Sequence, residues 1–138
     1  MEIREAGLTA LYERIKAQRE SIGVKTFIRN PGRSAEESDL LVLFMFEGRD
    51  VIIERSSRGW LGYPCRRELE VTLEAIATAG FDIRAFYRRL RTVVLSDPVL
   101  SKGCAIRETR AEGPMNYARP NTIGMQMVLS MTYMDDGT

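Results

Sequence analysis

The sequence has no histidine and only two cysteines. Without an imidazole, the chain cannot build a Ser-His-Asp or Cys-His catalytic set, and most zinc and haem sites are excluded as well. Cys65 and Cys104 lie too far apart for a CxxC site and are too few for a zinc cluster. We therefore expect two buried thiols in a cytoplasmic protein, and no metal or organic cofactor.

Long apolar runs and net charge are also lacking. The longest apolar run, Leu40 to Phe46, is far shorter than the roughly 20 residues that span a bilayer, and Met1 to Glu5 has no basic segment leading into an apolar one. Twenty basic and 19 acidic residues give a net charge of +1. We therefore expect no membrane insertion, no secretion, and no specific nucleic-acid binding by overall charge.

Lysine is scarce among the basic residues, with three Lys against 17 Arg. Arginine suits planar, bidentate pairing with carboxylates, as it is used at protein interfaces. A GC-rich genome would give the same bias without functional meaning. Both interpretations remain open.

The residues that are present fit one domain, 1–138, because 44% of the 138 residues are hydrophobic. Apolar residues at helical spacing predict an amphipathic helix over Ile3 to Ser21, which Gly23 ends. A second helix follows Asp82 as N-cap and stops before Asp97-Pro98. Its predicted apolar stripe is Ile83, Phe86, Tyr87, Leu90, Val93 and Val94.

Strand patterns occupy most of the remaining sequence. Leu40 to Phe46 reads as a buried strand that Gly48-Arg49-Asp50 breaks before Val51 to Glu54, which predicts a hairpin. Further strands are expected at Val24 to Ile28, Leu69 to Glu74, Ala105 to Thr109 and Ile123 to Tyr133, with loops at Asn30 to Asp39, Ser56 to Pro64 and Glu112 to Asn121. The sequence therefore predicts an α+β fold, a mainly antiparallel sheet of roughly four to six strands with two helices packed on one face.

Two charged stripes are candidate interaction surfaces. Glu68, Glu70 and Glu74 share one strand face, where a solvated face is favoured over acid/base catalysis or cation binding. Arg84, Arg88 and Arg91 share one face of the second helix. Because the neighbouring aromatic residues belong to the core stripe, a protein partner or plain solvation is favoured over phosphate or single-strand binding.

Trp60 and Tyr63 lie in the predicted loop from Ser56 to Pro64. Aromatic side chains in such a loop can anchor a partner. They can equally cover the core of their own domain. The chain has no GxGxxG, GxxxxGK or GxSxG motif, so nothing in this loop predicts a phosphate site or a nucleophile.

The carboxyl-terminal half resembles the tail terminator proteins of long-tailed phages, the minor tail protein U group. The resemblance spans Leu69 to Tyr133. It consists of the strand Leu69-Glu70-Val71-Thr72-Leu73, the helix Ile83 to Leu95, the stop Ser96-Asp97-Pro98-Val99-Leu100 and the final strand Gly124 to Tyr133.

This resemblance implies a non-enzymatic virion protein. Such a subunit forms a homo-hexameric ring on the completed tail tube, stops its polymerisation and presents a surface to the head. The implied partners are further copies of the chain, a tail tube protein and a head-completion protein, with assembly in the bacterial host cytoplasm and a final place at the head-tail junction of the virion.

Two other classes of protein are weighed against this one. A nucleic-acid-binding module would use Arg84, Arg88 and Arg91, and its binding would weaken with salt. A small enzyme would use Glu70 and Glu74, and it would need a pocket that joins them to other polar groups.

Overall fold

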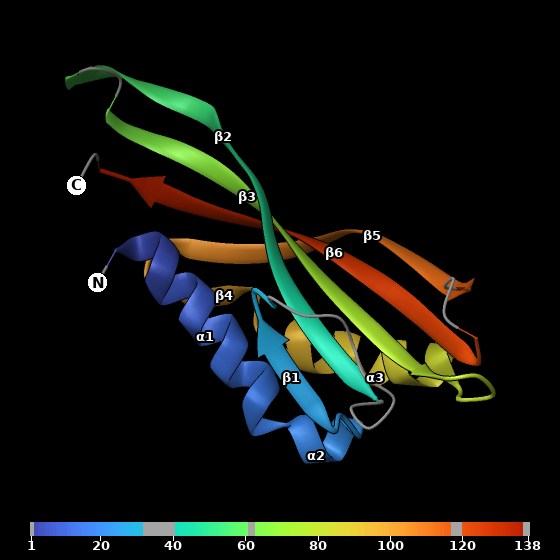
Figure 1. Ribbon diagram of the computed structural model, residues 1–138. Coiled ribbons are helices and arrows are strands. Elements are labelled where there is room, and N and C mark those ends of the chain that lie inside the picture. The colour runs from blue at the N-terminus through green and yellow to red at the C-terminus, as the bar shows by residue number, and fades with distance from the viewer. Residues whose placement is uncertain (1, 32–40, 61–62, 117–119, 137–138) are drawn as a thin grey trace.

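The computed structural model describes residues 2–31, 41–60, 63–116 and 120–136. Within this part of the chain, three helices accompany six strands (Figure 1). The helices are α1 (Ile3–Ala17), α2 (Arg19–Ile22) and α3 (Ile83–Val94). The strands are β1 (Thr26–Arg29), β2 (Val42–Trp60), β3 (Tyr63–Thr78), β4 (Val99–Ser101), β5 (Cys104–Asn116) and β6 (Thr122–Asp135).

All six strands form one curled sheet in the order β1-β2-β3-β6-β5-β4. Every neighbouring pair is antiparallel except β1 and β2, which run parallel. The predicted α+β class and the mainly antiparallel sheet are therefore confirmed. Among the described residues, no helix is long and apolar enough to cross a membrane.

The amino-terminal helical region differs from the single predicted helix. The first helix ends at Ala17, and after Gln18 a separate turn of helix, α2, runs to Ile22. Gly23 ends α2 in the left-handed conformation with φ of 82°, as the sequence predicted for that position. The described chain therefore has three helices where two were expected.

The core follows the predicted apolar stripes. The buried residues of β3 and β6 alternate along each strand, and they share one cluster with the buried residues of α3. The members named here are Leu69, Val71, Leu73, Met127, Leu129, Met131, Ile83, Phe86, Leu90 and Val94. Asp82 caps α3 as expected, because its Oδ1 atom accepts a hydrogen bond of 3.1 Å from the backbone N–H of Ala85.

The first helix also belongs to this core. Leu8, Leu11 and Ile15 are fully buried in the same cluster. The Arg14 guanidinium donates hydrogen bonds of 2.8, 2.7 and 3.1 Å to the backbone carbonyls of Val94, Asp97 and Val99. Since the last carbonyls of a helix have no partner within it, Arg14 ties α1 to the point where α3 ends.

The predicted hairpin between Phe46 and Val51 is wrong. β2 continues through this region as one strand, and its pairing with β3 shifts register between Glu47 and Asp50. Gly48-Arg49 therefore forms a β-bulge and not a turn. A bulge adds a residue to one strand without ending it, so its glycine resembles a turn signal in the sequence.

Two other predicted loops are largely strand. Across Ser56 to Pro64, β2 runs to Trp60 and β3 begins at Tyr63, so β2 and β3 extend beyond the part of β3 that pairs with β6. Across Glu112 to Asn121, β5 runs to Asn116, and Met115 pairs with Gly124 of β6. Cross-strand pairing here overrides the local preference of Gly, Ser and Pro. Of the predicted loop Asn30 to Asp39, residues 32–39 lie outside the described residues.

Candidate interaction surfaces

Glu68, Glu70 and Glu74 lie on one face of β3, opposite the buried Leu69, Val71 and Leu73. We call these three residues the glutamate face. Glu74 accepts a 2.6 Å hydrogen bond from Nε2 of Gln126 on β6, and the Glu68 carboxylate lies 4.0 Å from the Arg107 guanidinium. One partner is an amide and the other an arginine, and neither contact brings two of these carboxylates together. The structure therefore places the glutamates on a polar sheet surface.

Arg84, Arg88 and Arg91 lie exposed on α3, and we call them the arginine stripe. They are not equivalent. Arg91 donates a 3.0 Å hydrogen bond to Glu108 of β5, whose other carboxylate oxygen accepts one from the Tyr87 hydroxyl. Burial, and then this hydrogen bond, raise the pKa of Tyr87. In the described part of the chain, the guanidinium groups of Arg84 and Arg88 make no hydrogen bond or ion pair.

The two surfaces face opposite sides of the sheet. Glu108, which binds α3, pairs in register with Leu129 and shares the core side with it. Glu70 pairs with Ser130, the next residue of β6, and therefore points to the other side. α3 packs its apolar side on this core side, so the arginine stripe lies on the α3 side of the sheet, and Arg91 reaches β5 from there. One chain thus presents basic and acidic patches in opposite directions.

Trp60 and Tyr63 are brought together by the fold. They are register partners where β2 and β3 meet, at the end of the projecting pair of strands (Figure 1). This backbone position is a strand end and not the loop expected from the sequence.

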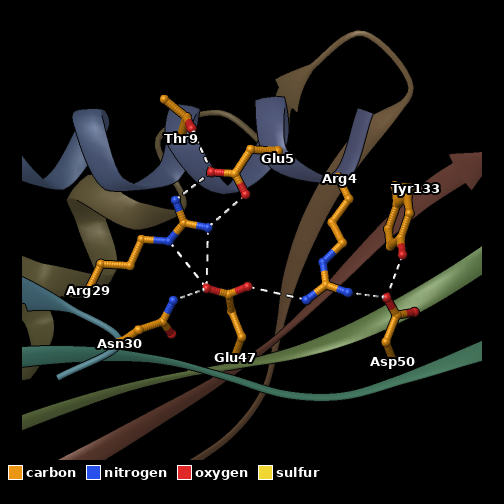
Figure 2. Close-up of polar contacts among 8 residues, drawn as sticks. All are labelled: Arg4, Glu5, Thr9, Arg29, Asn30, Glu47, Asp50 and Tyr133. Carbon is orange, nitrogen blue, oxygen red and sulfur yellow. Dashed lines mark hydrogen bonds and ion pairs between the residues drawn. The ribbon is translucent and has the colours of Figure 1, made fainter. Parts of the chain in front are cut away.

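A network of charged side chains, which the sequence patterns did not reveal, joins α1 to the start of the sheet. Figure 2 shows Arg4 and Glu5 of α1 meeting Arg29, Glu47 and Asp50. Arg29 holds Glu5 through two hydrogen bonds of 2.8 and 2.9 Å. Arg4 bridges the two acids of β2, with hydrogen bonds of 3.2 Å to Glu47 and 2.8 Å to Asp50.

The bulge in β2 builds this network. Glu47 pairs with Val71 and Asp50 pairs with Leu69, two residues of β3 that point into the core. Without the register shift, side chains three apart on a strand would point to opposite sides. The bulge turns both carboxylates toward α1, where Arg4 reaches both. The signal in the sequence was an acid on each side of Gly48-Arg49, which resembles a turn.

The network favours the ionised form of its two glutamates, Glu5 and Glu47. Hydrogen bonding from Arg29 lowers the pKa of Glu5 despite an opposing effect of burial. Burial alone would raise the pKa of Glu47, but hydrogen bonds from Asn30 and Arg4 and the charge of Arg29 bring it below its ordinary value. For Tyr133, burial and the hydrogen bond that it donates to Asp50 raise the pKa of the phenol. These groups are therefore locked in one charge state near neutral pH.

A surface cleft of about 460 Å³ opens beside this network. Its walls come from the start of α1, the bulge of β2, the neighbouring part of β3 and the end of β6. Arg4, Arg67, Asp50 and Asp135 line it, and Arg67 donates a 2.6 Å hydrogen bond to Asp135. Across the ranges that the structure describes, no group of three or more metal-ligating side chains could hold an ion.

Cys65 and Cys104 are free thiols, and both are buried as expected. Burial raises the pKa of the Cys104 thiol to about 11. Since the thiolate is the nucleophilic form, burial disfavours the reactive state of this cysteine.

Comparison with known proteins identifies the fold but not a family. No family model matches the chain, and no curated protein matches it by sequence. Among solved structures, a chain in the structure titled "Virion of native gene transfer agent (GTA) particle" is similar, with a TM-score of 0.56 and 13% sequence identity. The match covers 92% of this chain and 93% of that chain, so the two share their fold over nearly the whole length.

Proposed function

We propose that this chain is a structural subunit of a phage or phage-like particle. The observation that carries the proposal is the shared fold with a chain of a gene transfer agent virion, which extends over 92% of the present chain. A match of that extent concerns the whole architecture, including the curled sheet and its helices, and not one recurring motif. At 13% identity the likeness rests on fold and not on shared side chains.

Within that class, we propose the role of tail terminator. The chain would form a homo-hexameric ring on the finished tail tube, stop its growth and offer a surface to the head-completion protein. The resemblance of Leu69 to Tyr133 to tail terminators supports this assignment. The opposite orientation of the glutamate face and the arginine stripe also supports it, because a ring closes through head-to-tail contacts between two different, complementary patches.

The proposed role is not enzymatic. Within the described residues, the acids of the charged network are each held by arginine side chains of the same chain. Glu70 and Glu74 lie on a strand face and line none of the clefts near that network. A general acid or base needs a pKa near the working pH, whereas the pKa values of Glu5 and Glu47 are lowered by their arginine partners.

Nucleic-acid binding is the second candidate, and one contact weakens it. Arg91 is engaged with Glu108, which leaves two of the three stripe arginines for phosphates. Two phosphate contacts would provide only weak binding at physiological salt.

Deleting the coding sequence from the bacterium that produces the particle would test the role. A terminator that is absent cannot stop polymerisation, so we expect tails of excessive and variable length, with heads left unjoined, by electron microscopy. Supplying the wild-type gene in trans should restore a uniform length. Tails of normal length in the deletion strain would rule out a terminator, and loss of the particle without overlong tails would indicate a different virion subunit.

A further inference from the structure

A small apolar pocket lies beside the arginine stripe. It holds about 100 Å³ and is lined by residues of α3, β5 and β6, namely Ile83, Arg84, Tyr87, Ala111, Glu112, Gly113 and Met125. A dry apolar cavity of roughly 150 Å³ accepts benzene, so this one has room for a single aliphatic side chain. The Arg84 guanidinium lies at the pocket without an intramolecular partner in the described chain.

The opposite side of the sheet carries a matching feature. Val51 of β2 is 38% exposed although it is apolar, and it is the register partner of Glu68 on β3. Directly opposite residues of an antiparallel pair point to the same side, with Cβ atoms about 5 Å apart. Val51 therefore stands on the glutamate face, as an apolar projection next to a carboxylate.

We propose that Val51 of one copy inserts into the α3 pocket of the next copy, which brings Glu68 to Arg84 and Arg88. The occupant is a second copy of this chain because both halves of the contact are present on it, an apolar projection beside an acid and an apolar pocket beside two unpaired arginines. The proposal rests on the proposed function, since it names the anchor of the contact that would close the ring.

The charges on the rim favour this occupant. Glu112 also lines the pocket, but it lies 3.6 Å from Arg110, so Arg84, Arg88 and Arg110 outnumber this acid around the pocket. The contact is heterologous, because the pocket and Val51 lie on opposite sides of the sheet. Such a contact continues from copy to copy, and it forms a ring when the rotation between copies closes.

A double variant, Val51→Cys with Ala111→Cys, tests the contact directly. Two cysteines cross-link only when their Cα atoms lie within about 7 Å, and the native Cys65 and Cys104 are buried and do not interfere. The variant is supplied to the deletion strain, the assembled particles are oxidised, and the chain is examined on a denaturing gel without reductant. We expect a ladder of linked copies from the double variant and none from either single variant.

Two charge and volume variants give a second readout. Val51→Asp removes the apolar anchor, and Ala111→Leu fills the pocket; each should lower the number of particles with tails of normal length at least tenfold. The matched control is Val99→Asp, because Val99 is 53% exposed on β4 and belongs to neither surface. It should change that number less than twofold. Thermal melting should show all three variants folded.

The outcomes separate this inference from the proposed function. Normal tails without a ladder, or normal tails in both Val51→Asp and Ala111→Leu, would overturn the contact and leave the terminator role standing. Normal tail length in the deletion strain itself would overturn the role. A ladder together with defective assembly in the two variants would establish the contact.

Discussion

Gly7 of α1 lies so close to Cys104 of β5 that a Cβ atom on Gly7 would stand 2.2 Å from the Cys104 Sγ atom. The same atom would lie 3.1 Å from the Met131 sulfur. Gly7 has ordinary helical conformation, so its lack of a side chain serves the packing of the helix on the sheet. This contact sets how closely α1 approaches β5 and β6.

Replacing Gly7 by Ala should therefore destabilise the protein. At an exposed helical site the change would stabilise by about 1 kcal/mol, whereas forcing a methyl group into a packed core costs about 1–3 kcal/mol. We expect a lower free energy of unfolding in urea. Cys104→Ala in the same chain should restore part of the loss, because it removes the sulfur that the new methyl group meets. A Gly7→Ala protein as stable as wild type would show that α1 shifts at little cost.

Leu90 tests the docking of α3. It is fully buried in the cluster that contains Met127 and Leu129. Leu90→Ala should lower the free energy of unfolding by about 2–5 kcal/mol, through lost burial and the cavity left behind. Arg88→Ala, on the exposed side of the same helix, is the control and should change stability by less than about 0.5 kcal/mol. Equal stability of the two variants would mean that α3 is not docked as described.

Acid should loosen the attachment of α1 to β2. Folding lowers the pKa of both Glu5 and Glu47 from the ordinary 4.5, so their contribution is complete above that value and is lost as the pH falls through the lower, folded-state value. We expect the free energy of unfolding to decline below about pH 5. Glu47→Gln should cost about 1–2 kcal/mol at pH 7 and flatten this decline.

A matched control for that titration is Glu54→Gln. The Glu54 side chain is 73% exposed and lies 3.7 Å from Arg66, a surface pair. Its replacement should leave the acid decline unchanged when chemical unfolding is measured from pH 3 to pH 7. An equally steep decline in Glu47→Gln and wild type would remove Glu47 from the acid response.

The parts of the fold that the sequence predicted well are those with a repeating pattern. α3 and β6 bury most of a clear periodic stripe, with Tyr87, Val93 and Ile123 partly buried at its edges. Asp82 caps the helix where its side chain can reach the free N–H groups. These features depend on residues that are close in sequence, so the sequence pattern contains their signal. The predictions of α3, β6 and the cap were correct for that reason.

The errors fall where distant pairing decides the structure. Gly48 interrupts an apolar pattern in the way that a turn would. β2 nevertheless pairs with β3 both before and after Gly48. The charged network depends on that bulge, because only the register shift places Glu47 and Asp50 on one side. No pattern of near neighbours encodes it. Helical spacing predicts that the three arginines share one face of α3. It does not predict that Arg91 is bound by Glu108 of β5, which is distant in sequence.

Charge reversal across the proposed subunit contact gives the last prediction. Arg88 is the arginine to reverse. Arg91 is bound to Glu108 within its own chain, so reversing the charge of Arg91 would also disturb Glu108. Glu70 is the matching acid, because it lies on the glutamate face and, within the described chain, forms no ion pair. Arg88→Glu or Glu70→Arg alone should reduce ring formation in sedimentation, since each places like charges together. Both changes in one chain should restore part of it, because every contact then regains opposite charges.

Salt distinguishes this coupling from a general effect of altered charge. Exposed charges are screened within about 10 Å at 0.1 M ionic strength, so the wild-type ring should weaken as salt rises. The defect of each single variant should shrink over the same range, because screening removes repulsion as well as attraction. Reversal of Arg19 to Glu on α2 is the control for Arg88→Glu, since it makes the same change in net charge outside both surfaces. If Arg88→Glu and Glu70→Arg assemble as wild type does, these residues lie outside the contact, and a ring would have to close through other surfaces.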